Sequence, residues 1–284
     1  MAVSVIDRSD HAVVTAPLDR HRDRFEIGSI GKTMTAGALA SLVGDGVVAL
    51  DTPIGDVLDA GGNGDLRVVE LARHTSGLPD LPPNRDSFTA SADPFADFDE
   101  GQAELGLRQS VVANRGQVAY SNFAYALLGL LLTRVAGTTF EDLLRRCLWN
   151  PLAMNNTSVT GEQHPILNGF AGTQPAPHWH ALLPGPGAVT STIEDMERYL
   201  AGVLRPPITE VGEAIRASID AELGWLPGPG GAIWHNGETA GFHAMLAADL
   251  LHDRGCVALS NNSALSDLDV VVARAAQATE TFSS

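Results

Sequence analysis

The order in which strand-like and helical patterns follow one another most limits how this chain can fold. Short β-branched or alternating runs lie near both ends of the 284 residues and resume after residue 205, while helical periodicity fills most of the middle. The strand-like runs are residues 3–6, 12–16, 231–235, 242–250 and 256–260. We therefore expect a sheet domain from residues 1–55 and 205–284, with residues 56–204 inserted as a mostly helical domain. This arrangement is an α+β fold.

Four local elements are expected within this frame. Residues 3–16 predict a hairpin, the chain from Ser29 to about Gly44 predicts a helix, and residues 267–278 predict another. The apolar stripe of the helix after Ser29 consists of Ile30, Met34, Ala38 and Leu42. Residues 123–148 predict a core helix, because their apolar run is shorter than the ~20 residues that span a bilayer.

Residues 80–104 differ in composition from the segments around them. They hold two adjacent prolines and seven acidic side chains against the single basic residue Arg85. Such a segment predicts a long surface loop. Loops of this length are either lids over a site or solvated excursions, and the sequence leaves both readings open.

Charge and cysteine content limit the partners of the protein. Acidic residues outnumber basic ones by 34 to 18, a formal net charge of −16, so we expect neither nucleic acid nor a membrane surface as a partner. Cys147 and Cys256 lack the C-x-x-C spacing of metal or redox sites and are expected as buried thiols. The first residues lack the basic and long apolar segments of a secretory signal, so we expect a cytoplasmic protein.

Three catalytic or binding motifs overlap around Ser29, and one of them fits. Gly31-Lys32-Thr33 ends a phosphate-loop pattern, but Glu26 stands at the first glycine of that pattern and would repel phosphate. The nucleophile elbow G-x-S-x-G fails because Ile27 occupies its first position. The pattern Ser29-x-x-Lys32 remains, since residues i and i+3 of a helix share a face. The start of a helix also supplies main-chain N–H groups for an oxyanion.

Lys32 is the single lysine of the chain, against 17 arginines. Arginine does not release its proton at usable pH, so a site that needs a neutral amine must use lysine. We therefore interpret Lys32 as the base that takes the proton of Ser29. Its pKa must then fall well below the ordinary value of about 10.4, which burial and a second nearby cation can achieve. The alternative is that Lys32 is a helix surface residue without a chemical role.

The segment Tyr120-Ser121-Asn122 precedes the predicted core helix. A tyrosine hydroxyl at this point can share a proton with Lys32, and the amide of Asn122 can donate to a substrate carbonyl. Taken alone, the segment also has a purely structural interpretation, as the start of a helix.

The segment His235-Asn236-Gly237 ends a strand-like run. The main-chain N–H of the next residue, Glu238, is a candidate second oxyanion donor beside that of Ser29. This segment alone also has a structural interpretation, as the end of a strand.

Three residue pairs follow one another in a fixed order: Ser29 with Lys32, Tyr120 with Asn122, and His235 with Gly237. In this order they resemble the three motifs of the serine β-lactamase and penicillin-recognising superfamily. The similar branch is that of class C β-lactamases, family VIII esterases, D-aminopeptidases and related acyltransferases. Further similar segments are His74-Thr75-Ser76-Gly77, Pro151-Leu152-Ala153-Met154 and Leu223-Gly224-Trp225. The resemblance implies an antiparallel sheet flanked by helices, with the active site between it and the helical domain.

The resemblance implies a serine hydrolase or acyltransferase that acts on a small-molecule ester or amide. Ser29 would form the acyl-enzyme, Lys32 and Tyr120 would transfer protons, and Asn122, His235, Gly237 and the main chain of Glu238 would bind substrate. Water or another acyl acceptor would release the acyl group, and no cofactor is expected. The oligomeric state stays open.

One departure from the family pattern bears on the substrate. His235 stands where class C β-lactamases carry a lysine, so a group that titrates near neutrality replaces a fixed positive charge. This weakens β-lactamase or D-amino-acid peptidase activity, which remain the alternatives among enzymes. A catalytically silent ligand-binding protein of the same fold is the alternative of another class, although none of the three motifs is lost.

The histidines of His178-Trp179-His180 have the i, i+2 spacing of zinc ligands on a strand. No H-E-x-x-H motif or thiolate pair accompanies them, so we expect no metal site. In the similar family the stretch before Gly187 lies near the active site. The resemblance therefore places Trp179 among the substrate-binding residues.

Overall fold

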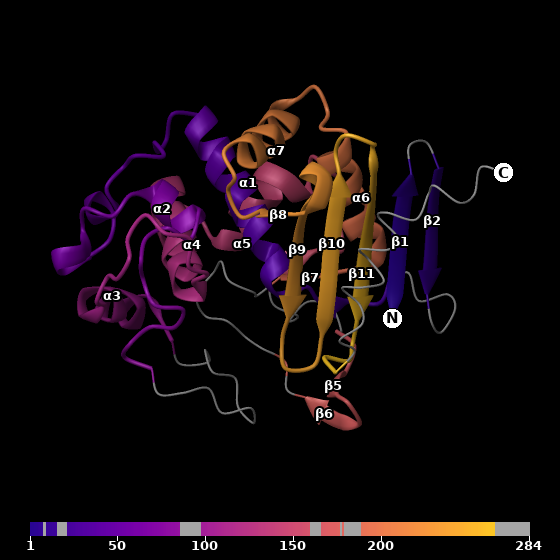
Figure 1. The fold of residues 1–284 in the computed structure, drawn as a ribbon, viewed down its shortest axis with the longest axis horizontal. Coiled ribbons are helices and arrows are strands. Elements are labelled where there is room, and N and C mark those ends of the chain that lie inside the picture. Colours follow the sequence, from indigo (N-terminus) through magenta and orange to yellow (C-terminus); the bar gives the residue numbers. More distant parts are fainter. Residues whose placement is uncertain are drawn as a thin grey trace.

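An antiparallel sheet of six strands joins the two ends of the chain in this computed structural model (Figure 1). The structure describes residues 1–7, 10–15, 22–85, 98–159, 166–176, 178 and 189–264. The strand order is β2-β1-β11-β10-β9-β8, so β1 pairs with β2 on one side and with β11 on the other. The strands are β1 Ala2–Asp7, β2 Asp10–Thr15, β8 Leu226–Pro227, β9 Ile233–Glu238, β10 His243–Asp249 and β11 Arg254–Ser260. The predicted α+β fold, its hairpin and its shared sheet are confirmed.

The two central strands are buried on both faces. Nearly every residue of β10 and β11 is buried, whereas β1 alternates buried and half-buried residues. Leu246 and Val257 belong to the main hydrophobic core, and Met245 and Cys256 belong to a smaller cluster. Because successive side chains of a strand point to opposite faces, the main core and the small cluster lie on opposite sides of the sheet.

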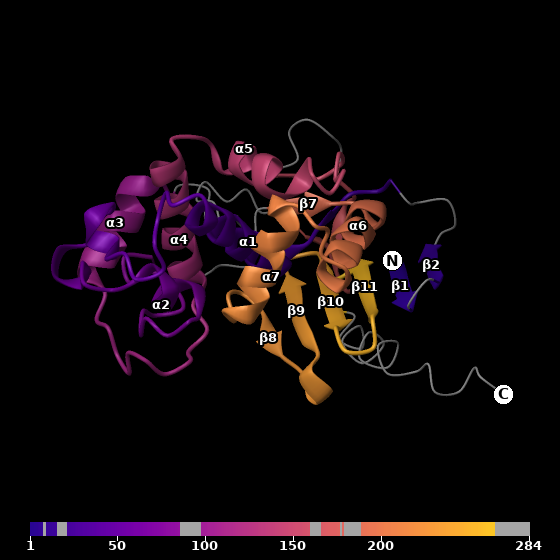
Figure 2. The ribbon, with the colours of Figure 1, turned by 90° about the horizontal axis from the view of Figure 1, so that it is seen from above.

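Helices cover one face of the sheet and extend past its β8 edge (Figures 1 and 2). Helix α6 Ile193–Leu204 packs on β1, β10 and β11, and α7 Glu210–Asp220 packs on α6 and on α1 Gly31–Gly44. Beyond α1, helices α2 Val68–Ala72 and α3 Glu100–Gln109 both contact α4 Asn122–Ala136. Helix α1 thus lies between the helices on the sheet and those beyond its edge.

The predicted helix after Ser29 is confirmed, although its first turn is a 3₁₀ turn, Gly28–Ile30. Buried residues occupy more of the helix surface than the predicted apolar stripe. Besides Met34 and Leu42, the polar residues Thr33 and Thr35 are also buried, because α1 is covered by α4, α7 and the turn after α5. Their hydroxyls donate to main-chain oxygens one turn earlier. The chain can therefore bury this helix on every side.

The predicted core helix of residues 123–148 consists of two helices. Helix α4 ends at Gly137, whose φ of 61° lies in the left-handed region that glycine adopts freely. Helix α5 Phe140–Leu144 begins after Thr139, whose side chain caps it, and continues as a π-helical turn, Arg145–Trp149. Residues 123–132 are all buried, as expected of a core helix. No single helix in the described part of the chain is long and apolar enough to cross a membrane; α4 passes that test only together with α5 and its π turn, across an 80° bend.

Two short sheets complete the described fold. β3 Phe25–Glu26 pairs with β7 Val189–Ser191, which also pairs with β4 Ser158–Val159, and β5 Gly169–Ala171 pairs with β6 Gln174–Ala176. The sheet that contains β3 matters for the site, because β3 leads directly into Ser29.

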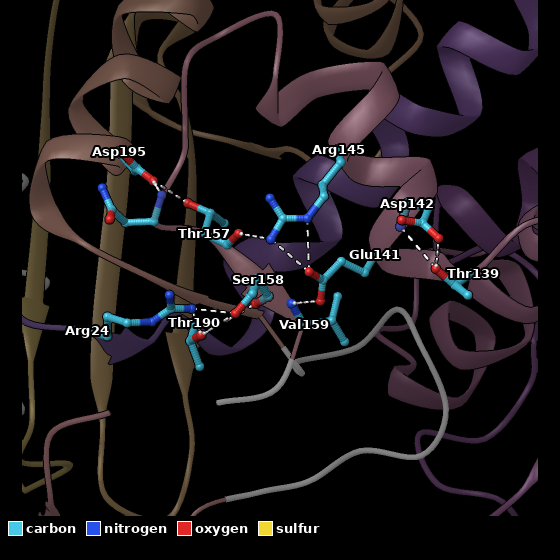
Figure 3. A network of polar contacts seen from close by, with 11 residues as sticks. Arg24, Thr139, Glu141, Asp142, Arg145, Thr157, Ser158, Val159, Thr190 and Asp195 are labelled. Carbon is cyan, nitrogen blue, oxygen red and sulfur yellow. Dashed lines mark hydrogen bonds and ion pairs between the residues drawn. The ribbon is translucent and has the colours of Figure 1, made fainter. Parts of the chain in front are cut away.

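A buried polar network holds this small sheet against α5 and α6 (Figure 3). Before β3, the Arg24 guanidinium donates to the hydroxyls of Ser158 and, at 2.7 Å, Thr190. The fully buried Asp195 carboxylate accepts the Thr157 hydroxyl at 2.9 Å. These bonds fix the segment from which Ser29 emerges.

Two sequence expectations are wrong in part. The loop predicted for residues 80–104 gives way to α3 at Glu100, because Asp99 caps this helix by accepting the N–H of Gln102 at 2.9 Å. The stretch after residue 205 contains the helix α7, which buries Val211 and Ile215 on one face. Residues 86–97 and 267–278 lie outside the described residues, so the lid and the last helix stay predictions, as does the division into domains.

We expect Asp195→Ala to lower the free energy of unfolding by about 2–4 kcal/mol, because the N–H of Asn156 and the hydroxyl of Thr157 lose a buried acceptor. Urea unfolding measures the change. The matched control is Asp45→Ala at an exposed position, which should change stability by less than about 0.5 kcal/mol. Equal losses in the two variants would contradict a structural role for the network.

Candidate active site

Ser29 lies where β3 turns into α1. Gly28 before it has a φ of 50°, and a Cβ added at Gly28 would lie 2.7 Å from the main-chain nitrogen of Glu238. Both observations require glycine at this position. The half-buried Ser29 follows in the 3₁₀ turn before α1. The turn thereby holds the serine close to the end of β9.

The structure places the Lys32 amine directly beside the Ser29 hydroxyl. The distance from Lys32 Nζ to Ser29 Oγ is 2.7 Å, and Nζ also donates to Asn122 Oδ1 at 2.8 Å. Helical spacing brings Ser29 and Lys32 together, and the packing of α1 against α4 brings in Asn122. The hydroxyl of Ser29 is therefore within reach of an amine that can accept its proton.

Burial is what makes this amine a candidate base. Lys32 is 0% exposed, and its burial lowers its pKa to about 7, while the nearby Asp80 carboxylate opposes this shift. Of the two causes that can lower the pKa of a lysine, burial or a nearby cation, burial is the one that acts on Lys32. The deprotonated amine is thus present in quantity near neutral pH.

Tyr120 lies next to the same pair but has the opposite acid–base character. Lys32 Nζ is 4.9 Å from the centre of the Tyr120 ring, and the phenol hydrogen-bonds with Ser29. Desolvation raises the pKa of Tyr120 to about 12, although the Ser29 contact lowers it. Tyr120 therefore stays protonated at neutral pH, and Lys32 is the better candidate for the base.

Asn122 is held between Lys32 and Asp80. Its Oδ1 accepts from Lys32, while its Nδ2 and main-chain N–H both donate to Asp80 Oδ1, at 2.9 and 3.0 Å. An amide nitrogen carries two hydrogens, so one remains for the substrate carbonyl that the sequence assigned to Asn122. Sequence reasoning missed Asp80, which it counted as one acid of a surface loop.

His74 is a second residue that sequence reasoning left without a role. Its ring stacks on Tyr120 with 4.5 Å between centres, and its Nδ1 accepts the N–H of Ser121 at 3.0 Å. Burial, with the neighbouring Lys32, lowers the pKa of His74 to about 3, so the ring is neutral. The segment His74-Thr75-Ser76-Gly77 was the available signal, but it did not indicate this contact.

The expectation that His235 titrates near neutrality is wrong. The ring is 1% exposed, and burial together with Lys32 lowers the pKa of His235 to about 3. Its Nδ1 donates to the main-chain oxygen of Asn236 at 2.6 Å, so the neutral ring presents an unprotonated Nε2. The centre of the His235 ring lies 6.1 Å from the centre of the Tyr120 ring, so His235 is part of the site. It is a weak base at neutral pH.

Gly237 allows β9 to approach the serine. A Cβ at this position would lie 1.9 Å from the main-chain oxygen of Ile27 and 3.1 Å from the main-chain nitrogen of Ser29. A gap of 1.9 Å to a main-chain atom leaves no room for any side chain. The glycine that the sequence singled out is thus a steric requirement of the site.

The main-chain N–H of Glu238 points toward the same place. Thr239 donates to Phe242 at 3.0 Å, so the next pair, Glu238 with His243, occupies the non-hydrogen-bonded position of the hairpin. The N–H of Glu238 is therefore directed away from β10, toward the side of β9 that faces β8. On that side β8 pairs only with Ile233 and Trp234 at the start of β9, so it does not reach Glu238. The main-chain nitrogen of Glu238 lies against Gly28, and the main-chain nitrogen of Ser29 lies against Gly237, so both nitrogens are at the contact between the turn and β9.

The predicted residues of the 178–180 segment are only partly described. Trp179 and His180 lie outside the described residues, so the substrate-binding role of Trp179 stays a prediction. His178 Nδ1 lies 2.7 Å from the buried carboxylate of Glu26, three residues before the nucleophile. Within the described ranges, no three His, Cys, Asp or Glu side chains form a group that can hold a metal ion.

A serine beside a buried amine, with the main-chain nitrogens of Ser29 and Glu238 close by, is an arrangement that suits the formation of acyl-serine intermediates. A family model described as Beta-lactamase matches residues 1–280 of the chain. The chain therefore belongs to the β-lactamase family. The resemblance noted from its three motifs is confirmed.

Individual relatives agree with this assignment. Penicillin-binding protein 4 of Amycolatopsis lactamdurans is 28% identical over 224 residues, 70% of this chain and 55% of that protein. The D-alanyl-D-alanine-carboxypeptidase/endopeptidase AmpH of Escherichia coli K12 is 29% identical over 221 residues, 70% of this chain and 56% of that protein. The chain thus spans about half the length of these relatives.

Solved structures show the same fold. A β-lactamase/D-alanine carboxypeptidase from Yersinia pestis, complexed with citrate, superposes with a TM-score of 0.80 at 23% identity, covering 97% of this chain and 91% of that one. A class C β-lactamase superposes with a TM-score of 0.80 at 20% identity, covering 98% and 90%. At these identities the likeness defines the fold of the chain.

We expect Gly237→Ala to reduce the rate of Ser29 acylation by about 10²-fold or more, because the new methyl group pushes β9 away from the turn and displaces an oxyanion donor. A fluorophosphonate labelling rate measures the loss. Gly44→Ala, where nothing lies within 4 Å of the added carbon, is the matched control and should label at the wild-type rate. Wild-type labelling of Gly237→Ala would exclude the close approach described above.

Proposed function

We propose that the protein is a serine hydrolase or acyltransferase that acts on small esters or amides through an acyl-enzyme on Ser29. The observation that carries the proposal is the 2.7 Å contact between the Ser29 hydroxyl and the buried amine of Lys32. The site supplies a nucleophile, a base with a pKa near 7 and a phenol that keeps its proton. These are the groups that acyl transfer requires.

In the acylation step, Lys32 Nζ takes the Ser29 proton while Ser29 Oγ forms a bond to the substrate carbonyl carbon. The negative charge that develops on the carbonyl oxygen is stabilised by the N–H groups of Ser29 and Glu238. The carbon–leaving-group bond then breaks, and Tyr120 donates its proton to the leaving group and regains one from the Lys32 ammonium. The products are the leaving alcohol or amine and a serine ester.

In the second step an acceptor attacks the serine ester. Water gives hydrolysis, and an alcohol or amine gives acyl transfer. The acceptor loses a proton to Lys32 or through Tyr120, and Ser29 Oγ leaves with a proton. His235 contributes little as a base here, because burial lowers its pKa to about 3. Asn122 orients the acyl part through its remaining amide hydrogen.

β-Lactamase or D-amino-acid peptidase activity is the second candidate, favoured by the names of the relatives above. The neutral state of His235 argues against it, because a substrate carboxylate beside this residue would meet no positive charge there. A catalytically silent binding protein of the same fold is the third reading. It does not account for a lysine pKa lowered to the value that a general base needs.

Intact mass spectrometry tests the acyl-enzyme directly. We expect a covalent adduct on the wild type after exposure to a p-nitrophenyl ester or a fluorophosphonate, and none on Ser29→Ala. A fluorescent penicillin added in parallel distinguishes the two enzymatic candidates. If the wild type forms no adduct, or Ser29→Ala forms the same one, the proposed function is wrong.

The pH dependence tests Lys32 as the base. The amine must be deprotonated to act, so kcat/KM should rise as pH increases through about 7 and fall about tenfold per pH unit below it. Lys32→Arg should lower kcat/KM by about 10²–10⁴-fold, because arginine stays protonated. Retained turnover in Lys32→Arg would exclude the amine as the base.

Protein stability reports on the same amine without any assay of activity. Burial lowers the pKa of Lys32 in the folded state to about 7, so between this value and the ordinary pKa of about 10.4 the unfolded chain binds more protons. The free energy of unfolding should therefore increase with pH across this window. Lys32→Met should remove the contribution of Lys32 to this pH dependence. If the pH dependence of the variant equals that of the wild type, the pKa of Lys32 is not lowered in the folded state.

A further inference from the structure

Asp80 is an exposed carboxylate that the structure fixes close to the Ser29–Lys32 pair. Its Oδ1 accepts two bonds from Asn122, and its main-chain oxygen accepts the N–H of Phe123 at 2.9 Å. The same Asn122 side chain accepts from Lys32. Asp80 therefore lies two hydrogen bonds away from the amine, beside the start of α4.

These contacts use one oxygen of the carboxylate. Oδ1 accepts both bonds from Asn122, and Oδ2 has no partner among the described residues. Oδ1 helps to cap α4, because it accepts the N–H of Asn122, while Ser121 accepts the N–H of Ala124 at 2.9 Å. Neither of these capping contacts uses Oδ2. One oxygen of Asp80 is thus fixed in place, exposed and available to a ligand.

The basic side chains placed around Ser29 above supply no fixed positive charge to balance Asp80. His74 and His235 are neutral because burial lowers the pKa of each to about 3, and Lys32 must lose its proton to act. A substrate that approaches Ser29 therefore meets a negative field from Asp80.

We propose that Asp80 binds a protonated amine of the substrate, so that the enzyme prefers esters or amides whose acyl part carries an ammonium group over those that carry a carboxylate. This inference rests on the proposed function and narrows the substrate class of the same site. Asp80 is bonded to Asn122, which orients the acyl part, and this places the ammonium there and not on the leaving group. The carboxylate attracts a cation and repels an anion at this range.

Three esters of similar length test the proposal: the p-nitrophenyl esters of 3-aminopropanoate, butanoate and succinate, with cationic, neutral and anionic acyl parts. The three esters differ in their chemical reactivity. For each ester we therefore compare kcat/KM of Asp80→Asn with kcat/KM of the wild type, and this ratio is independent of that difference. At about pH 8, where Lys32 is mostly deprotonated and the substrate amine protonated, Asp80→Asn should lower kcat/KM about tenfold or more for the cationic ester. The neutral ester should change less than about threefold, and the anionic ester should improve.

Asn keeps the side-chain oxygen that Asn122 needs, so Asp80→Asn retains the contacts at the start of α4. The matched control is Asp45→Asn, which makes the same change in net charge at the opposite end of the 14-residue α1, about 20 Å away. It should leave all three ratios near unity. An equal loss for all three esters in Asp80→Asn would show that Asp80 only positions Asn122, and would overturn the proposal.

A second measurement needs no variant. With the neutral ester as substrate, propylammonium should inhibit the wild type more strongly than propanoate, and the difference should shrink as salt rises from about 0.05 to 0.5 M. Equal inhibition by the two ions would overturn the proposal even if Asp80→Asn failed to fold. Failure of the proposed function looks different, because Ser29 then forms no adduct with any of the three esters.

Discussion

The proposed chemistry of this protein depends on the burial of one amine. The Lys32 side chain projects from the first turn of a helix that is covered on every side, so its ammonium form loses most of its hydration. A hydroxyl and an amide oxygen contact the amine, and the carboxylate of Asp80 lies one residue farther away. The helix packing therefore sets the proton affinity of the base, and a looser core around α1 would weaken the chemistry before it altered the fold.

The same tight packing shapes the other half of the site. Gly28 and Gly237 leave so little space between the turn and β9 that the main-chain nitrogens of Ser29 and Glu238 both lie at this contact. Neither group depends on a flexible side chain, so little reorganisation is needed as charge develops on a substrate oxygen. Desolvation of the base thus depends on the helices packed around α1, and placement of the candidate donors depends on the contact of the 3₁₀ turn with β9.

The sequence predicted those parts of the fold and site that depend on local spacing. The strands at both ends, the helix after Ser29 and the i, i+3 relation of Ser29 to Lys32 are local patterns. The pKa of His235 is not, because it depends on burial by residues far away in the chain and on a bond to the adjacent main chain. Asp80 was hidden for the same reason, since its bonds to Asn122 join residues 42 apart. The helix α7 was missed because the strands around it dominated that part of the pattern.

The strand order of the sheet has a consequence for synthesis of the chain. Ser29 leaves the ribosome early, whereas β9, which carries the opposing glycine and N–H, and its neighbours β10 and β11 leave late. Pairing of β1 with β11 closes a loop of some 250 residues, and contacts of such long range form slowly. The nascent chain thus contains Ser29 without the opposing strand β9 for most of translation. Under the proposed function, a chain that stops short of the final hairpin lacks the donor expected from Glu238 and should not be acylated at Ser29.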